Sequence, residues 1–316
     1  MRVTRGLPAA AAAPAALTIG NFDGVHLGHQ AMLAELKRAA ARLALPACVL
    51  TFEPHPREFF APDRAPTRLT SLREKLEWLA SYGVDRVHLC RFDYRFAQTS
   101  PEDFIERIIA RGLGARWVLV GDDFRFGARR AGNLVMLKQA APRLGFEVAA
   151  LPSFTLDGER VSSTALREAL AEGKLERASR LLGRDYSISG RVVAGDGLGR
   201  KLGFPTANIL MKHNRPPLMG IFAVRLSVGS DVFPAVASLG VRPTVKQRGA
   251  PVLEVHALDY SGDLYRRHVR VEFLEKLRDE EKYADLATLT RQIAADVENA
   301  RAYFERAAAP APRRAG

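Results

Sequence analysis

The chain has 316 residues and a mass of 34.7 kDa, a length that predicts two domains because single domains cluster near ~100–150 residues. Hydrophobic residues make up 47% and charged residues 26% of the chain, which excludes a disordered chain, a collagen-like repeat and a disulfide-stapled mini-protein. Lys and Arg number 47 against 35 Asp and Glu, giving a net charge of +12. This charge admits a nucleic-acid partner or a phosphate-rich substrate. Only nine of the basic residues are Lys, however, and a coding bias would produce the same excess of Arg.

Cysteine usage and apolar segments indicate a cytoplasmic protein. Cys48 and Cys90 each lie in an apolar run and are predicted to be buried, reduced thiols. Residues 1–20 resemble a secretory signal in their basic start and alanine run, but Pro8 and Pro14 interrupt that run. No apolar segment approaches the ~18–20 residues of a membrane helix, so we expect no membrane partner.

The first half of the chain alternates apolar strand patterns with amphipathic helix patterns. This alternation predicts a parallel sheet with helices on both faces, and ligands bind such sheets at the carboxyl ends of the strands. The strands are predicted at 16–20, 47–52, 84–90, 116–121 and 146–151, and the helices at 29–45, 72–83, 101–112 and 134–145.

After about residue 180 the apolar pattern changes to a period of two. In 220–228, Phe222, Val224, Leu226 and Val228 share one face, which is typical of an antiparallel strand with one wet face. Several such strands predict a small barrel, followed by a closing helix near 284–305. The predicted organisation is a first domain over 1–182, a second over 183–306 and a disordered tail over 307–316.

The motif GNFDGVHLGH, residues 20–29, follows the first predicted strand and opens the first helix. Its glycines allow the backbone to pass close to a phosphate chain. His26 and His29 lie three residues apart at the positive end of a helix, where two imidazoles can stabilise charge on a transferred phosphate group. A metal-binding pair or two solvated histidines would be the alternatives for an isolated HxxH.

Three further segments of the first half carry weaker signals. Residues 52–56, FEPHP, are by themselves typical of a Pro-rich turn. In GDDFRFG, residues 121–127, Phe124 and Phe126 could pack near a ligand or simply form the edge of the hydrophobic core, and the sequence favours neither. In SSTALR, residues 162–167, serines suited to an N-cap precede Arg167 by one turn. Free N–H groups and a guanidinium could grip a triphosphate there, although an ordinary capped helix has the same pattern.

The motif GDGLGRKLGFPTANI, residues 195–209, is neither a P-loop nor GxGxxG. Its four glycines could wrap phosphates through backbone N–H groups, although plain hairpin turns would also use them. Thr206 and Asn208 supply a hydroxyl and an amide oxygen two residues apart, which are hard ligands suited to Mg²⁺ already held by ATP.

These motifs carry a family resemblance. GNFDGVHLGH resembles the HxGH signature of nucleotidylyltransferases, and GRKLGFPTAN resembles riboflavin kinase, so the chain is similar to the bifunctional bacterial riboflavin kinase/FAD synthetases from about residue 16 to about 305. The resemblance implies a Rossmann-like nucleotidylyltransferase domain followed by a riboflavin kinase barrel. It further implies two activities: riboflavin is phosphorylated to FMN, and FMN is adenylylated to FAD and pyrophosphate. ATP would be the co-substrate, Mg²⁺ the metal, and the flavins substrate and product.

For the adenylyl transfer, the resemblance assigns catalysis to His26, His29 and Arg167. The remaining residues that it places around the nucleotide and the flavin are Gly20, Asn21, Phe22, Gly24, Gly28, His55, Asp123, Phe124, Phe126, Ser162, Ser163 and Thr164.

For the kinase, the resemblance makes Glu254 the base that deprotonates the riboflavin 5′-hydroxyl, a role suited to a carboxylate within hydrogen-bond reach. Strand alternation alone would favour a surface glutamate. Thr206 and Asn208 would hold the metal, and Arg278 would lie near the flavin. The phosphate loop would comprise Gly195, Gly197, Gly199, Arg200 and Gly203.

Two positions depart from the family pattern, since Arg266 replaces a glycine and Asn133 stands where an acidic residue is common. Arg266 makes the predicted turn before the last strand less certain, but neither position is among the residues assigned to catalysis. The alternative functions are an HxGH transferase with another phosphate acceptor, which would lack GRKLGFPTAN, and a nucleic-acid-binding protein, which would show clustered basic and aromatic residues. We expect small-molecule substrates only, no nucleic acid, and a monomer or weak homo-oligomer.

Overall fold

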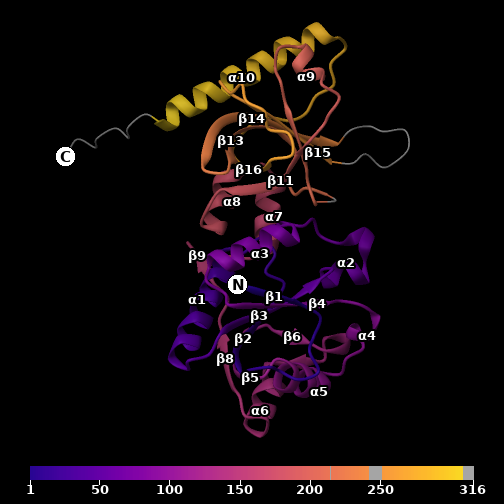
Figure 1. Cartoon of the computed structure of the whole chain (residues 1–316), viewed down its shortest axis with the longest axis vertical. Helices are drawn as coiled ribbons and strands as arrows, with labels where there is room; N and C mark the ends of the chain where they lie inside the picture. Colours follow the sequence, from indigo (N-terminus) through magenta and orange to yellow (C-terminus); the bar gives the residue numbers. More distant parts are fainter. Residues whose placement is uncertain (214, 242–250, 309–316) are drawn as a thin grey trace, which may run out of the picture. The chain divides into compact units, whose positions relative to one another are not determined.

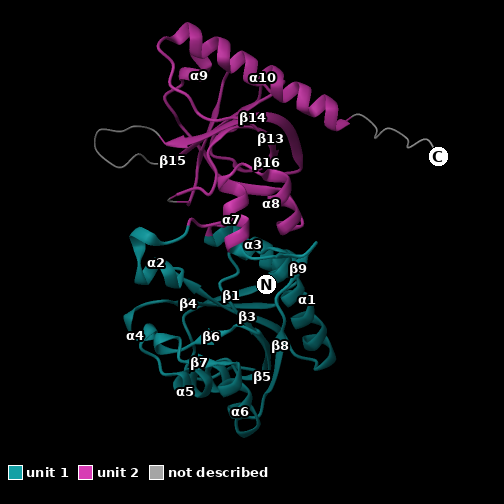
Figure 2. Cartoon of the chain, turned by 180° about the vertical axis from the view of Figure 1, so that it is seen from behind, with its two compact units in different colours: residues 1–66, 72–163 teal, residues 67–71, 164–316 magenta. Residues whose placement is uncertain are grey.

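The computed structural model describes residues 1–213, 215–241 and 251–308 (Figure 1). The chain divides into two compact units (Figure 2): unit 1 comprises residues 1–66 and 72–163, and unit 2 comprises residues 67–71 and 164–316. Each unit has its own hydrophobic core.

Unit 1 is built on a six-stranded sheet in which every neighbouring pair of strands is parallel. In spatial order the strands are β1 (Arg2–Arg5), β4 (Arg86–Arg91), β3 (Ala47–Glu53), β2 (Ala15–Ile19), β5 (Ala115–Gly121) and β8 (Glu147–Leu151). Every residue of the central strand β2 is buried, as expected for a strand covered on both faces.

Helices cover both faces of this sheet. On one face α1 (Leu27–Arg42) and α3 (Leu72–Ser81) share a core with β2, β3 and β5. On the other face, α6 (Leu134–Leu144) and a π-helical segment (Phe104–Gly112) pack on β2 and β5. Shorter elements complete the unit: α2 (Pro56–Phe60), α4 (Tyr94–Ala97), α5 (Pro101–Asp103), 3₁₀ turns (Pro62–Arg64, Ala128–Arg130), β6 (Arg125–Phe126), β7 (Gly132–Asn133), β9 (Thr155–Leu156) and β10 (Glu159–Arg160).

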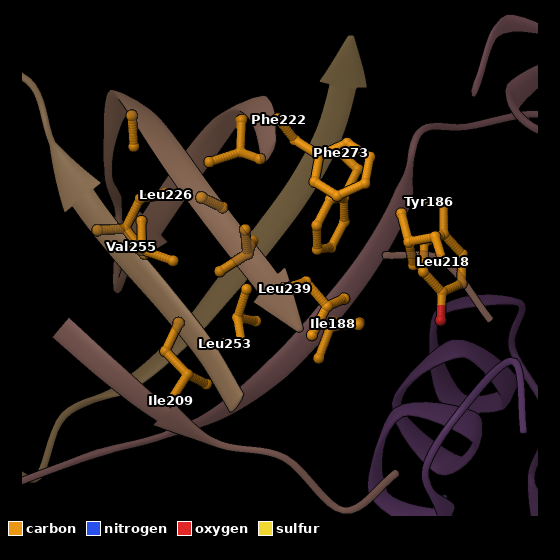
Figure 3. Packing of buried hydrophobic residues seen from close by; sticks show 14 of the residues in the cluster. Tyr186, Ile188, Ile209, Leu218, Phe222, Leu226, Leu239, Leu253, Val255 and Phe273 are labelled. Carbon is orange, nitrogen blue, oxygen red and sulfur yellow. The ribbon is translucent and has the colours of Figure 1, made fainter. Parts of the chain in front are cut away.

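Unit 2 is a closed six-stranded antiparallel barrel. Around the barrel the strands are β11 (Tyr186–Val193), β12 (Ala207–Leu210), β15 (Pro251–Ala257), β14 (Asp231–Val241), β13 (Gly220–Val228) and β16 (His268–Arg278). Figure 3 shows the interior side chains, among them Phe222, Phe273 and Leu253, which are fully buried. The face predicted for 220–228 is confirmed, because Phe222, Val224, Leu226 and Val228 point into this core.

Four helices accompany the barrel in the part of the chain that the structure describes. Helices α7 (Ser163–Ala171) and α8 (Leu175–Leu182) contribute Leu166, Leu170 and Leu182 to the barrel core. The long helix α10 (Leu286–Ala308) packs on the outer face of the barrel, where Val297 and Ala300 meet residues of β13 and β14 (Figure 1). A short helix, α9 (Leu198–Lys201), lies within the glycine-rich segment.

The predicted fold class is confirmed: a parallel sheet with helices on both faces is followed by an antiparallel barrel and a closing helix. Both cysteines are buried and free, as expected. In the large sheet and the barrel, two strands escaped the sequence analysis: β1 at the sheet edge and β12, which begins inside the GRKLGFPTAN motif. The two-residue strands β6, β7, β9 and β10 escaped it as well. Helix α10 continues to Ala308, and the rest of the tail predicted to be disordered lies outside the described residues.

The turn before β16 accommodates Arg266 in a glycine-like conformation. Its φ is +64°, in the left-handed region where a Cβ atom is disfavoured. The turn is held to β11, since the N–H of Arg266 donates to the carbonyl of Val192 at 3.0 Å and the N–H of Val192 donates to the carbonyl of Arg267 at 2.9 Å. The turn therefore survives the departure at a cost in backbone strain.

We expect Arg266→Gly to stabilise unit 2 by about 0.5–1 kcal/mol, because relief of the left-handed strain exceeds the extra backbone entropy of glycine in the unfolded chain. Thermal unfolding of the full chain measures the change. Arg267→Gly is the matched control, because Arg267 has no positive φ, and it should lower the midpoint. An equal loss in both variants would contradict the strain at Arg266.

Candidate functional site

The first candidate site lies at the carboxyl end of β2, where the chain turns into α1. The carboxyl end of β2 is held to β3, since the N–H of Gly20 donates to the carbonyl of Leu50 at 3.1 Å. His26 is the N-cap of α1, and its Nδ1 accepts from the N–H of His29 at 3.4 Å. These contacts order the turn, and its histidines lie at the positive end of the helix.

The two histidine rings are stacked. Their centroids are 3.7 Å apart and their planes differ by 18°. A Cβ atom added at Gly28 would lie 3.3 Å from the ring of His26, so the glycine of HxGH leaves room for this stack. Burial first, then the ring of His26 and the charge of Lys75, hold the pKa of His29 well below its ordinary 6.5. The pair is therefore built around a neutral His29.

Two buried polar atoms at this turn have no hydrogen-bond partner among the residues that the structure describes. They are Oδ1 of Asn21 and Nδ1 of His29. Buried polar atoms are nearly always paired, so an unpaired acceptor and an unpaired ring nitrogen at one strand end indicate a polar ligand site. The sequence analysis predicted both residues, and the structure brings them to the same turn.

Lys75 of α3 is a residue that the sequence analysis missed. It is 5% exposed, and its ammonium is close enough to lower the pKa of His29. The signal was present in the sequence, because Lys75 lies three residues after Leu72 and four before Leu79, on the inward stripe of the helix. A charge on such a stripe is a candidate for a site.

The SSTALR segment divides between the two units. Within unit 1, the hydroxyl of Ser163 donates to the carbonyl of Asp23 at 3.0 Å, which ties this segment to the HxGH turn. Within unit 2, Nε of Arg167 donates to the carbonyl of Thr67 at 2.6 Å. The first contact brings a predicted serine to the predicted turn, whereas the phosphate role of Arg167 stays a prediction.

The other predicted residues of unit 1 have structural contacts of their own. His55 caps α2, with Nδ1 accepting from the N–H of Arg57 at 3.1 Å. Asp123 accepts a hydrogen bond from Arg160 at 2.7 Å. Phe126 is buried and stacks with Phe124 at a centroid distance of 5.3 Å. These contacts fix the side chains, and their roles toward nucleotide and flavin stay predictions.

The second candidate site lies on the outer face of the barrel. Asn208 of β12 is directly opposite Glu254 of β15, and Glu254 is opposite Ser238 of β14. Directly opposed residues of antiparallel strands point to the same face with Cβ atoms ~5 Å apart. The interior is taken by Leu253 and Val255, so this row points outward. The predicted metal ligand and the predicted base are therefore neighbours.

The glycine-rich loop folds against this row. A Cβ atom at Gly195 would lie 2.2 Å from Nδ2 of Asn208, and one at Gly199 would lie 3.1 Å from Oγ1 of Thr206. The backbone thus approaches both oxygen-bearing side chains more closely than another residue would allow. Thr206 and Asn208 offer hard, neutral oxygens, a donor set that fits Mg²⁺ brought in by ATP.

Arg278 is engaged inside the fold. Its guanidinium makes a bidentate pair with Asp296 of α10 at 2.8 and 2.7 Å, and its Nη1 donates to the carbonyl of Asp279 at 2.9 Å. Hydrogen bonding to Asp296, the largest cause, raises the pKa of Arg278. The pair fastens α10 to the end of β16, and contact with a flavin stays a prediction.

Two separate sites suited to phosphate groups, one in each unit, place the chain in the class of two-domain transferases that act on nucleotides. Family models agree: residues 9–165 match FAD synthetase and residues 182–304 match riboflavin kinase. The Escherichia coli K12 bifunctional riboflavin kinase/FMN adenylyltransferase is 46% identical over 96% of this chain and 98% of its own. The Pseudomonas fluorescens enzyme of the same name is 48% identical over 90% and 91%. The chain belongs to the family of bifunctional riboflavin kinase/FMN adenylyltransferases.

A solved structure supports the same architecture. A Streptococcus pneumoniae protein described as a macrolide-efflux protein superposes with a TM-score of 0.82 at 27% identity, covering 95% of this chain and 99% of its own. Within the described part of this chain, no helix is long and apolar enough to cross a membrane.

We expect the His29 ring to stay neutral well below its ordinary pKa of 6.5, because burial and two basic neighbours oppose its charge. Ring ¹⁵N NMR of the full chain, assigned with His29→Gln, measures this. An unfolded chain takes up the proton near pH 6.5. The stability of unit 1 should therefore fall as the pH drops below that value, less so in His29→Gln. A ring that is protonated at pH 7 would contradict the neutral pair.

Proposed function

We propose that this chain carries out both activities of its family, using ATP to phosphorylate riboflavin to FMN and then to adenylylate FMN to FAD. The proposal is carried by the pairing of Asn208 with Glu254 in unit 2, alongside the separate, stacked histidine pair in unit 1. Each unit thus has its own residues for one transfer. Flavins and ATP are the substrates; we further infer a cytoplasmic monomer or weak homo-oligomer that binds no nucleic acid.

In the kinase step, Glu254 acts as the general base. It accepts the proton of the riboflavin 5′-hydroxyl while that oxygen forms a bond to the γ-phosphorus of ATP, and the bond to the β-phosphate oxygen breaks to release ADP. The strand register supports this role, because a base must lie beside the bound phosphates. Mg²⁺, held by Thr206 and Asn208, would neutralise phosphate charge.

In the adenylyl transfer, the protein mainly positions and stabilises. A phosphate oxygen of FMN attacks the α-phosphorus of ATP, the α–β anhydride bond breaks and pyrophosphate leaves. His26 and His29 lie where negative charge would develop, at the amino end of α1, and the unpaired Nδ1 of His29 can donate to a phosphate oxygen. No covalent intermediate with the protein is needed.

The direct test supplies riboflavin or FMN separately, each with ATP and Mg²⁺, and separates the flavins by chromatography. Riboflavin should give FMN and then FAD, and supplied FMN should give FAD. A chain that adenylylates another phosphate acceptor, and neither flavin, would instead support the alternative of an unrelated HxGH transferase. The riboflavin kinase match over 182–304 argues against that alternative.

Replacing His29 by alanine should lower the rate of FAD formation from FMN by about 10²–10³, the usual cost of removing one preorganised donor to developing charge. FMN formation from riboflavin by the same preparation is the control and should be unchanged. Loss of both activities in a folded protein would contradict the assignment of His29 to one transfer.

Replacing Glu254 by glutamine should lower FMN formation by about 10²–10⁴, because the amide keeps the size of the side chain and cannot accept the proton. Adenylylation of supplied FMN should be retained. The matched control is Glu272→Gln, a half-buried glutamate of β16 that pairs with Arg225 at 3.2 Å. Equal effects of the two substitutions would exclude a special role for Glu254.

A further inference from the structure

Strand β15 carries a second polar side chain on the face that holds Glu254. Leu253, Val255 and Ala257 point into the barrel core, so Glu254 and His256, two residues apart, point outward together. His256 lies opposite Val236 of β14. Neither the motif nor the chemistry of the kinase step described above uses this histidine.

His256 holds the end of the glycine-rich loop. Its Nδ1 lies 2.8 Å from the carbonyl oxygen of Pro205, and its ring meets the ring of Phe204 edge-on at a centroid distance of 5.7 Å. A carbonyl oxygen only accepts, so Nδ1 must carry the proton and donate it. The hydrogen bond therefore fixes both the tautomer and the direction of the Pro205 carbonyl, immediately before Thr206.

Contacts within the glycine-rich loop link the position of the Pro205 carbonyl to that of the Thr206 side chain. The N–H of Phe204 donates to the carbonyl of Gly199 at 2.8 Å. A Cβ atom at Gly199 would lie 2.4 Å from the carbonyl oxygen of Phe204 and 3.1 Å from Oγ1 of Thr206. Gly199, Phe204 and Thr206 thus lie against one another, and a shift of the Pro205 carbonyl would displace the Thr206 hydroxyl.

We propose that His256 is a positioning residue for the kinase step, which sets Thr206 relative to Glu254 by donating from Nδ1 to the Pro205 carbonyl. This inference rests on the proposed kinase function. One rigid strand then carries the base directly and, through His256, the loop that bears Thr206 and the phosphate-binding glycines. His256 itself touches no reacting atom.

Loss of the His256 hydrogen bond is expected to affect the KM for MgATP more than the other kinetic constants. Because the loop would hold MgATP, loss of the hydrogen bond should raise the KM for MgATP in the kinase reaction by about 3- to 10-fold, the equivalent of one hydrogen bond. The KM for riboflavin and the adenylylation of supplied FMN should change less than twofold. A residue that only stabilises the barrel would instead lower the kinase kcat and the thermal midpoint without separating the two KM values.

The test uses the full chain and three substitutions. Asparagine places its amide N–H close to the position of Nδ1, whereas glutamine extends the amide further and alanine removes the donor. We expect His256→Ala and His256→Gln to raise the KM for MgATP, and His256→Asn to keep it near the wild-type value. An unchanged KM for MgATP in His256→Ala, or equal losses in all three variants, would overturn the proposal.

Ring ¹⁵N NMR of the wild-type chain reads the hydrogen bond without any activity. In the neutral ring Nδ1 should carry the proton and Nε2 should not, and the opposite tautomer would overturn the inference even in an active enzyme. A wild-type chain that forms no FMN from riboflavin, with the Nδ1–H tautomer present, would overturn the proposed kinase function together with this role. The two failures are therefore distinguishable.

Discussion

Closure of the barrel is the constraint on which the kinase site depends. β16 pairs with both β11 and β13, so no strand of the barrel can slide without breaking pairs on both of its sides. A slip of one residue would move every side chain of a strand to the opposite face. The core residues Leu253 and Val255 therefore fix Glu254 on the outer face, and the pairing with β12 fixes Asn208 beside it. Apolar burial inside the barrel positions the polar row outside.

In unit 1, the candidate site is positioned by the tight turn between a buried strand and a helix. A buried parallel strand ends at Ile19, the chain turns tightly, and α1 starts with a histidine as its cap. A side chain at Gly28 would crowd the ring of His26, and burial with the neighbouring charges favours the neutral form of His29. Two imidazolium rings at a centroid distance of 3.7 Å would repel each other. A neutral His29 avoids that repulsion.

The sequence predicted what depends on period and local motif. Alternation placed Phe222 and Leu226 in the core, and the HxGH spacing placed both histidines at one helix start. It did not predict contacts that depend on tertiary pairing. β12 is only four residues long, and it begins at the end of the glycine-rich GRKLGFPTAN motif, whose composition is typical of a loop. The hydrogen bond from His256 to Pro205 joins residues 51 positions apart, a separation that no local pattern reveals.

Much of the positive charge of the described residues lies in exposed ion pairs. Many arginines lie in exposed ion pairs, such as Arg143 with Glu106 and Arg301 with Asp259, and such surface pairs contribute little to stability. The proposed kinase site would use the neutral oxygens of Thr206 and Asn208, and the HxGH turn of unit 1 has a neutral His29 near the buried cation Lys75. Neutral groups repel one another little, and when they are preorganised they can stabilise charge that develops on a phosphate. In the proposed sites, recognition of polyphosphates would therefore depend on geometry more than on the net charge of +12.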